Sequence, residues 1–180
     1  MRIGRSTPMH SPGTVGRLAA AVLVGATCAL ASTAPLAGQD AYPDDVSSID
    51  AIIEAYYDVI SGPAGEMVDV ERDRSLHHPE AWVSIANVDA EGRPTVRVMT
   101  LDDYHAGNEE TPRATPFYEW ETSREVRRTG NVVHVWSDYA SSREPDGEPF
   151  TTGTNTITLW WDGSRWWVMG WMFDQSAGTG

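Results

Sequence analysis

The residues best suited to acid–base chemistry in this 180-residue chain fall in one polar stretch between residues 117 and 142. If Gly130-Asn131 forms a two-residue turn, the stretch folds into a hairpin with its acidic and imidazole groups on one face. That face carries Glu119, Glu121, Glu125, His134, Trp136 and Asp138. Histidine changes charge near neutral pH, so His134 is the best candidate for a general acid or base. The face either lines a pocket or meets solvent, and solvated acidic side chains are the commoner case.

Three other histidines give weaker signals. His77 and His78 are adjacent at the end of a predicted short helix, and adjacent side chains point in different directions. No HxxxH or HExxH spacing accompanies them, so a cation near a helix C-terminus is a better explanation than a metal site. His105 is expected at the surface, beside Gly107-Asn108. The chain has no GxGxxG, Walker, GxSxG or EF-hand motif, and the sequence therefore predicts neither a metal nor a cofactor.

The candidate acid–base residues must be positioned by helices and strands. The first of these elements shows helical periodicity. From Ile49 to Ile60, apolar residues recur at positions 49, 52, 53, 56, 57 and 60, the spacing of one helix face. Ser47 or Ser48 is a candidate N-cap, and Gly62-Pro63 is a stop signal. A second helix is expected from about Met67 to Leu76.

From Ala81 the pattern changes to alternation with period two, which indicates strands. A turn is expected at 89–94, a second strand at 95–100 and a short helix from Leu101 to about Asn108. Four long strands are then expected over residues 117–128, 132–142, 151–161 and 165–173, joined by Gly- and Asp-rich turns. Helices followed by a meander of antiparallel strands predict an α+β fold. Two or three helices would pack on one face of a curved, mainly antiparallel sheet of about six strands.

Three segments carry a resemblance to a known family. They are AIIEAYYDVISGPAG, NVVHVWSDYAS and TTGTNTITLWWDGSRWWVMGW, in that order, and the resemblance covers about residues 49–173. The chain resembles the nuclear transport factor 2-like superfamily, in its bacterial SnoaL-like (ketosteroid isomerase-like) branch. The resemblance implies a cone-shaped α+β fold with a pocket open at one end, and frequent homodimers. It implies little about activity, because members include isomerases, dehydratases, cyclases, hydrolases and non-catalytic binders.

The resemblance also implies roles for particular residues. In ketosteroid isomerase-like relatives a tyrosine on the first helix donates a hydrogen bond to a developing oxyanion, and Tyr56 or Tyr57 falls roughly at that place. Core packing is the alternative for both tyrosines. The same relatives carry a general-base aspartate on the first strand after the second helix, where this chain reads Trp82-Val83-Ser84-Ile85. An isomerase of that type therefore lacks its base. The candidate pocket residues are Trp82, Glu121, Trp136, Asn155 and Trp171.

Five of the 8 tryptophans lie in the segment LWWDGSRWWVMGWMFD, from Leu159 to Asp174. With Gly163-Ser164 as a two-residue turn, the segment is a hairpin that pairs Trp161 with Trp166 and Trp160 with Trp167. Both faces of this hairpin then carry large apolar side chains, whereas a sheet wet on one side would alternate apolar and polar residues. We therefore expect the helices to cover one face and a second subunit to cover the other, in a homodimer through the C-terminal sheet.

The same register bears on two of the pocket candidates. Extended along the hairpin, it places Asn155 on one face and Trp171 on the other. Only one of the two is therefore expected to reach a pocket.

The first 39 residues differ from the rest of the chain. They hold three arginines and no acid, and residues 18–30 (LAAAVLVGATCAL) form an apolar run. This is typical of a secretory signal peptide, with cleavage between about residues 31 and 39. An uncleaved membrane anchor and lipidation at Cys28 are less favoured, because the run is short for a span and Gly25 stands where lipoproteins usually have leucine. Residues 40–47 are interpreted as a linker, 48–175 as the domain and 176–180 as a flexible tail.

The charge of the chain excludes some partners. It has 13 arginines, no lysine and 26 acids, for a net charge of −13, and loss of three arginines with the signal would give −16. Phosphate backbones and anionic membranes are bound by basic surfaces, so we expect no nucleic-acid partner and no membrane contact after signal removal. The mature chain would also have no cysteine, and hence no disulfide.

Three functions are compatible with these features. The first is an exported protein, periplasmic or extracellular, that binds an unknown small molecule of apolar or aromatic character. The second is a pocket enzyme, an isomerase or lyase, with His134 as acid/base and Tyr56 or Tyr57 polarising an oxygen. The third is a non-catalytic dimerisation module. The catalytic assignment of His134 requires that its side chain and a tyrosine hydroxyl meet in one cavity.

Overall fold

The computed structural model describes residues 41–106 and 111–175. The chain divides into Met1–Ala34 and Pro35–Gly180, and all the described residues belong to the second unit. The expected signal segment at 1–39 and tail at 176–180 lie outside the described residues and stay predictions. No helix within the described ranges is long and apolar enough to cross a membrane.

The second unit combines helices with one six-stranded sheet. The helices are η1 (Asp44–Val46, a 3₁₀ turn), α1 (Ile49–Ile60), α2 (Val70–Leu76) and α3 (Leu101–His105). The strands are β1 (His77–Val88), β2 (Pro94–Thr100), β3 (Tyr118–Thr129), β4 (Val132–Ser142), β5 (Thr151–Trp161) and β6 (Trp166–Asp174). Their order in the sheet is β2-β1-β6-β5-β4-β3, so β2 and β3 form its two edges. Neighbouring strands are antiparallel except for β1 and β6, which are parallel.

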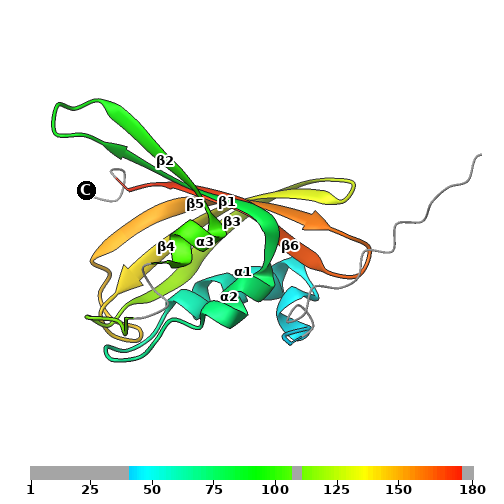
Figure 1. Ribbon diagram of the computed structural model, residues 1–180, viewed down its shortest axis with the longest axis horizontal. Helices are drawn as coiled ribbons and strands as arrows, with labels where there is room; N and C mark the ends of the chain where they lie inside the picture. Colours follow the sequence, from blue (N-terminus) through cyan, green and yellow to red (C-terminus); the bar gives the residue numbers. More distant parts are fainter. Residues whose placement is uncertain (1–40, 107–110, 176–180) are drawn as a thin grey trace, which may run out of the picture. The chain divides into compact units, whose positions relative to one another are not determined.

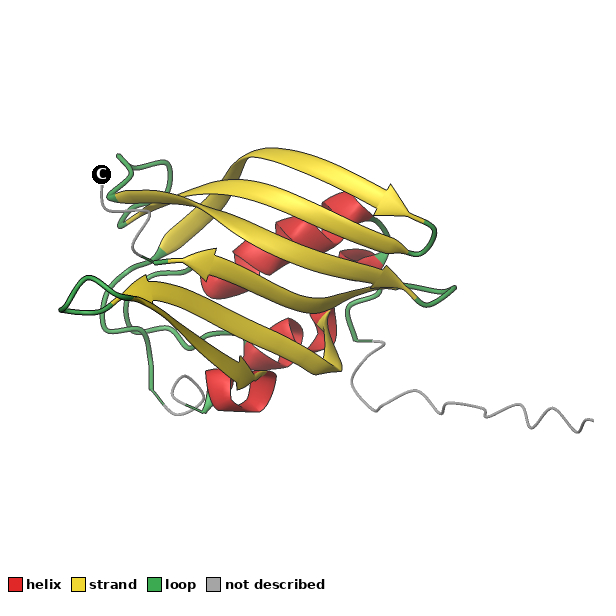
Figure 2. Ribbon diagram, turned by 90° about the horizontal axis from the view of Figure 1, so that it is seen from above, coloured by secondary structure: helices red, strands yellow, loops and turns green. Residues whose placement is uncertain are grey.

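The helices all lie on one side of a curved sheet (Figures 1 and 2). We call the sheet face toward the helices the inner face and the opposite face the outer face. α1 packs against β3 and β6, whereas α2 and α3 pack against β1. The predicted class, helices on one face of a curved and mainly antiparallel six-stranded sheet, is confirmed.

Capping residues explain where the helices begin. The Ser48 side chain accepts a hydrogen bond from the Ala51 backbone N–H at 3.0 Å, so α1 starts as predicted. α2 starts at Val70, later than the predicted Met67, because the Asp69 side chain caps it by accepting from the Arg72 N–H at 3.0 Å. The first strand begins at His77 rather than Ala81, directly after α2.

A β-bulge interrupts the pairing of β3 with β4. From the turn to Ser123, which faces Asp138, the predicted hairpin register is confirmed. At Thr122 the register shifts, so Glu121 faces Tyr139 and Glu119 faces Ser141. One extra residue reverses the facing of every side chain beyond it. The prediction that Glu119 and Glu121 share a face with His134 is therefore wrong, because the bulge turns both carboxylates to the inner face.

A second bulge lies in β6. Trp161 faces Trp166 and Trp160 faces Trp167, as predicted. Beyond them, Leu159 faces Val168 while Thr158 faces Gly170, which leaves Met169 as the extra residue. Trp171 is thereby turned to the inner face, opposite Ile157, and joins the buried core. The prediction that Asn155 and Trp171 lie on opposite faces is wrong for this reason.

The tryptophan hairpin is buried on both faces within one chain. On the inner face Trp166 belongs to the core that the helices cover. On the outer face Trp167 is also buried: the Arg165 guanidinium lies 3.7 Å from its ring centroid, and its indole N–H donates to the Asp162 carboxylate at 2.8 Å. The ring of His78 stands edge-on to Trp167 at 5.8 Å. Part of the outer cover that we expected from a second subunit is thus supplied by the chain itself.

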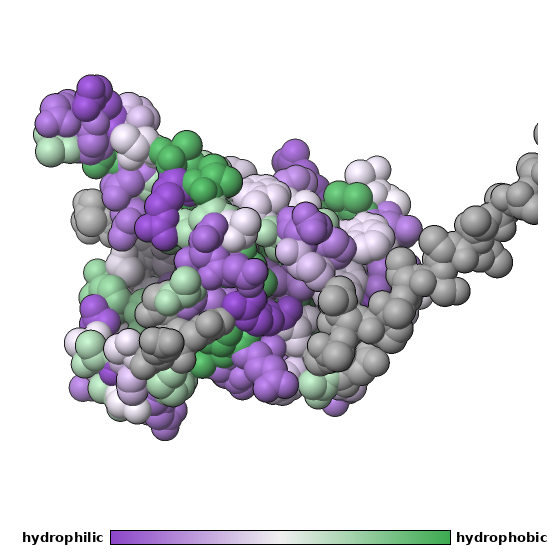
Figure 3. All heavy atoms as spheres, in the orientation of Figure 1, coloured by the Kyte–Doolittle hydropathy of each residue, from purple (hydrophilic) through white to green (hydrophobic). Residues whose placement is uncertain are grey.

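The remaining outer face leaves large apolar side chains in solvent. Of nine exposed large apolar residues among the described ones, six fall on this face by their register: Trp82, Val88, Val96, Val98, Val132 and Trp136. The indole of Trp82 lies directly over Gly170, where a β-carbon would come within 2.5 Å of the ring. Figure 3 shows hydrophobic side chains on the upper rim, next to the hydrophilic tip of the β1–β2 hairpin. The helices thus cover the inner face, whereas a large part of the outer face stays open to solvent.

A buried polar cluster joins α2, α3 and the start of β1. Asp73 and both His77 and His105 are almost fully buried, and His105 is only 1% exposed. The Nε2 of His105 lies 2.7 Å from an Asp73 carboxylate oxygen, although the two groups are not aligned for a hydrogen bond. The Nδ1 of His77 lies 2.7 Å from the Asp73 carbonyl oxygen. The predicted surface position of His105 is therefore wrong, because α3 places its last residue against a buried carboxylate.

We expect Asp73→Ala to lower the free energy of unfolding by about 3 kcal/mol, because it leaves two histidines buried without their common acidic partner. Urea denaturation monitored by tryptophan fluorescence measures the change. Asp50→Ala is the control: Asp50 pairs with Arg124 at the surface, and its loss should cost less than about 1 kcal/mol. Equal losses in the two variants would contradict the stabilising role of the cluster.

Candidate functional site

A cavity of about 400 Å³ lies between the helices and the inner face of the sheet. Its lining comes from α1, α3, the segment before β3, and strands β3 to β6. The lining residues are Tyr56, Ile60, Val68, Tyr104, Arg113, Ala114, Thr115, Phe117, Glu119, Tyr139, Arg143, Asn155, Trp171 and Phe173. Tyr56, Asn155 and Trp171 are buried and form its deep end, while Ala114, Thr115 and Arg143 are exposed and form its mouth.

The connection from α1 to β3 fixes one wall of this cavity. Gly62 and Phe117 exchange two backbone hydrogen bonds, of 2.7 and 3.0 Å, directly after α1 ends. The Ser61 hydroxyl accepts from the Glu119 backbone N–H at 3.0 Å and donates to the Tyr57 carbonyl at 2.8 Å. Glu119 is therefore held at a set position relative to α1.

Glu119 is the titratable group of the cavity with the most altered chemistry. Burial raises its pKa from an ordinary value of 4.5 to about 7, although hydrogen bonds from Ser141 and Asn155 act in the opposite direction. The Ser141 hydroxyl donates to one carboxylate oxygen at 2.7 Å. A carboxyl with a pKa near 7 can both release and take up a proton at neutral pH. This property makes Glu119 the best acid–base candidate in the described part of the chain.

A hydrogen-bond network continues from the cavity into the core. The Tyr57 hydroxyl lies 2.7 Å from the Ser137 hydroxyl and accepts from the Asn155 amide at 3.2 Å. Ser137 in turn donates to Glu121 at 2.5 Å. Burial raises the pKa of Tyr57 to about 12 and that of Tyr56 well above its ordinary value, so both hydroxyls stay protonated at neutral pH. The Tyr57 hydroxyl donates to Ser137, because the Ser137 proton goes to Glu121. The Tyr56 hydroxyl can donate to a bound molecule.

A glycine makes room for the tyrosine on the cavity floor. Tyr139 faces Gly153 across β4 and β5, and a β-carbon at Gly153 would come within 2.6 Å of the Tyr139 hydroxyl oxygen. The Tyr139 side chain therefore lies across the neighbouring strand instead of filling the cavity. The cavity depends on this small residue as well as on the bulges.

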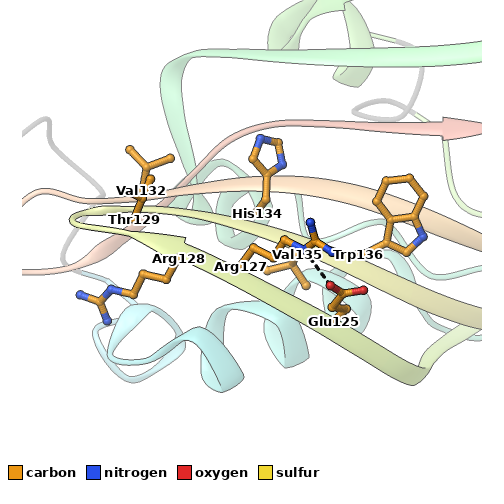
Figure 4. Close-up of a pocket in the computed structure, with 8 residues that line it drawn as sticks. All are labelled: Glu125, Arg127, Arg128, Thr129, Val132, His134, Val135 and Trp136. Atoms are coloured by element: carbon orange, nitrogen blue, oxygen red, sulfur yellow. Dashed lines mark hydrogen bonds and ion pairs between the residues drawn. The ribbon is translucent and has the colours of Figure 1, made fainter.

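The sequence-predicted acid/base, His134, lies on the other face of the sheet. His134 and Trp136 are exposed, and Figure 4 shows both side chains on the side away from α1 (cyan). They border a separate outer hollow of about 610 Å³, together with Glu125 and Arg127. Trp82 is also on the outer face and exposed. The sheet therefore separates His134 from Tyr56 and Tyr57, and the three residues cannot form one site.

The other predicted residues lie on the inner face. Tyr56, Asn155 and Trp171 line the cavity together. Tyr57 and Glu121 border an adjacent hollow on the other side of Glu119. Sequence reasoning missed Glu119, Tyr139 and Arg113 as cavity residues. The sequence placed Glu119 in the polar hairpin, but the residues around Thr122 give no sign of the bulge that turns Glu119 to the inner face.

The described residues contain no group of three or more His, Cys, Asp or Glu side chains arranged to hold a metal ion. The His77–Asp73–His105 cluster lies behind the cavity wall, with the His77 ring 4.8 Å from that of Trp171. Its contacts connect α2, α3 and β1, and the His77 ring packs against Trp171 in the cavity wall.

Comparison with known proteins places this architecture among known folds. No protein-family model matches the chain, and no curated protein matches it. A solved structure from Kribbella flavida is 16% identical, covering 78% of this chain and 94% of that one, with a TM-score of 0.51. An NTF2-like protein of unknown function from Silicibacter pomeroyi is 14% identical over 71% and 92%, with a TM-score of 0.47. Another from Methylobacillus flagellatus is 14% identical over 71% and 93%, with a TM-score of 0.44.

At such identities the likeness concerns the fold alone. Several of the similar structures are described as NTF2-like. The fold that the resemblance implied, with helices on one face of a curved and mainly antiparallel sheet, is the fold of this chain. The SnoaL-like branch stays a prediction.

We expect Glu119→Gln to stabilise the protein at pH 8 by about 2 kcal/mol. The folded protein keeps the Glu119 proton up to about pH 7, whereas an ordinary glutamate loses it near 4.5. Wild-type stability is therefore highest below pH 4.5 with respect to this group and falls as the pH rises to about 7. The glutamine variant lacks this fall. Urea denaturation between pH 5 and pH 8 measures the difference.

Glu125→Gln, on the exposed outer face, is the control for this prediction and should leave the pH profile unchanged. If the curves for the wild type and Glu119→Gln run parallel from pH 5 to pH 8, the raised pKa is wrong.

Proposed function

We propose that the protein is exported and binds a small molecule in the inner-face cavity. The observation that carries the proposal is the cavity itself, with the carboxyl of Glu119 turned into it by the Thr122 bulge. A volume of about 400 Å³ falls within the range of small-molecule pockets. Export rests on the signal-like segment at residues 1–39.

The lining indicates a ligand with both apolar and polar parts. Trp171, Phe117 and Phe173 offer aromatic surface, whereas Glu119 and Asn155 offer hydrogen-bonding groups. Apolar walls with a few converging polar groups are typical of sites that orient a small organic molecule. A ring system carrying a hydroxyl or carbonyl group fits this combination.

Acid–base catalysis on the bound molecule is a second candidate function. It is favoured by one observation, the pKa of Glu119 near 7 beside protonated tyrosine hydroxyls. Glu119 would take the place that the sequence had suggested for His134, and Tyr56 would donate to an oxygen of the substrate. A rate that depends on a group with a pKa near 7 and is lost in Glu119→Gln would distinguish an enzyme from a binding protein.

We also propose a homodimer formed through the outer face of the sheet. The exposed apolar side chains of this face include Trp136, which is 59% exposed. In a two-fold symmetric contact each copy would cover the same patch on the other. The chain as a whole is strongly acidic, but Glu125 and Arg127 form an ion pair of 2.7 Å on the outer face. The centre of this face therefore carries a positive charge as well as a negative one. Two copies can therefore approach there with little repulsion.

We expect Ala114→Trp to close the cavity. Ala114 is exposed at the mouth, so a large side chain there should block entry without disturbing the core. The neutral bicyclic probe 2-naphthol should bind the wild type and bind the variant at least about tenfold more weakly, a change of 1.4 kcal/mol. Calorimetric titration measures both affinities, and native mass spectrometry of protein purified from its own host reports a retained molecule.

Ala90→Trp is the matched control, because Ala90 is equally exposed but lies in the β1–β2 turn. Equal 2-naphthol affinity in the wild type and Ala114→Trp would overturn the cavity as the binding site.

We expect Trp136→Glu to dissociate the dimer, because it places a charge at the centre of the outer apolar patch. Sedimentation at micromolar concentration should give a dimer for the wild type and a monomer for the variant, with unchanged thermal stability of the monomer. Met67→Glu replaces another exposed apolar side chain, 45% exposed and outside the sheet, and should remain dimeric. A monomeric wild type would refute the dimer.

A further inference from the structure

The cavity is lined by two arginines, Arg113 and Arg143, that form no ion pair with a described acid. Elsewhere in the described chain, Arg72, Arg74, Arg93, Arg124 and Arg127 each form an ion pair with a carboxylate. Arg113 and Arg143, which both line the cavity, have no carboxylate of the described residues within 4.0 Å.

Arg113 is held in place by the end of α1. Its guanidinium donates to the backbone carbonyl oxygens of Ser61 at 2.9 Å, Val59 at 3.4 Å and Met67 at 3.2 Å. It also packs on Gly62, where a β-carbon would come within 2.6 Å of the guanidinium. Three of its five N–H groups are therefore engaged, and the carbonyls that engage them position the charge without cancelling it.

Arg143 reaches the mouth from the end of β4. It donates to the Pro116 carbonyl at 3.0 Å and to the Thr115 hydroxyl at 3.2 Å, and its guanidinium lies 4.2 Å from the Phe150 ring centroid. These contacts use one terminal nitrogen and one face of the guanidinium. The remaining N–H groups are left for a ligand, as in Arg113.

From this geometry we infer that the cavity binds an organic monocarboxylate, with its carboxylate between Arg113 and Arg143 and a hydroxyl or carbonyl group directed toward Glu119. The inference rests on the proposed binding function and adds the ligand class. Two arginines suit a carboxylate because guanidinium groups donate paired hydrogen bonds to its two oxygens. A doubly charged phosphate would meet more repulsion from Glu119 and from the net charge of −13.

The test compares matched ligands by calorimetric titration at low salt. The probes are 4-hydroxycinnamate, its neutral primary amide, and phenyl phosphate. We expect the carboxylate to bind at least about tenfold more tightly than the amide and than phenyl phosphate. Arg143→Gln should weaken carboxylate binding about tenfold and leave amide binding unchanged. Arg113→Gln should do the same, with thermal denaturation to check that α1 stays anchored.

Arg127→Gln is the matched control, because Arg127 lies on the outer face and should not affect either ligand. Equal affinities for the carboxylate and its amide would overturn the inference while leaving the binding function intact, provided that 2-naphthol still binds. Tighter binding of phenyl phosphate, or an equal effect of Arg127→Gln, would also overturn it. If neither the carboxylate nor 2-naphthol binds the wild type, the inference and the proposed function fail together.

Discussion

The shift of register at two β-bulges determines what the inner face of the sheet presents to the helices. Without the extra residue at Thr122, Glu119 would face solvent with His134. Without the extra residue at Met169, Trp171 would leave the core. Because side chains on a strand alternate, each single insertion reverses the facing of the strand end beyond it. The two strand segments whose facing is reversed both line the cavity next to α1. The β3 segment contributes the Glu119 carboxyl group, and the β6 segment contributes the Trp171 indole. The polar and the apolar parts of the cavity therefore have the same origin.

The sequence predicted what depends on local pattern, and it failed where tertiary pairing decides. Helix α1, the long strands β4 and β5, and the pairing next to both hairpin turns followed from periodicity and turn residues. The bulges could not be read in this way, because Thr122 and Met169 are ordinary strand residues that neither interrupt the alternation nor introduce glycine. The facing of Glu119, Glu121 and Trp171 was therefore predicted wrongly, because these residues lie beyond the bulges. His105 was misplaced for a related reason: a polar residue beside a loop is buried here only because Asp73, distant in sequence, lies opposite it.

The buried Asp73–His77–His105 cluster is in contact with the wall of the cavity. The His77 ring contacts Trp171 at 4.8 Å and Tyr56 at 6.3 Å, and both of these aromatic residues line the cavity. Tyr104 packs edge-on against Trp171 and against His105. The wall that a ligand would touch is thus supported from behind by the Asp73 cluster. Such backing fixes the orientation of aromatic side chains, and a fixed wall loses less entropy when a ligand binds.

The two edge strands of the sheet, β2 and β3, affect how copies of this chain can associate. An edge strand with free backbone groups invites another strand to extend the sheet without limit. On the β3 edge the chain places Arg124, Glu125, Arg127 and Arg128 in close succession and adds the Thr122 bulge, which disturbs the straight row of donors and acceptors. Growth by strand addition is thereby discouraged, while the broad outer surface remains open. A sheet with such an edge is protected against extension, strand by strand, into fibres.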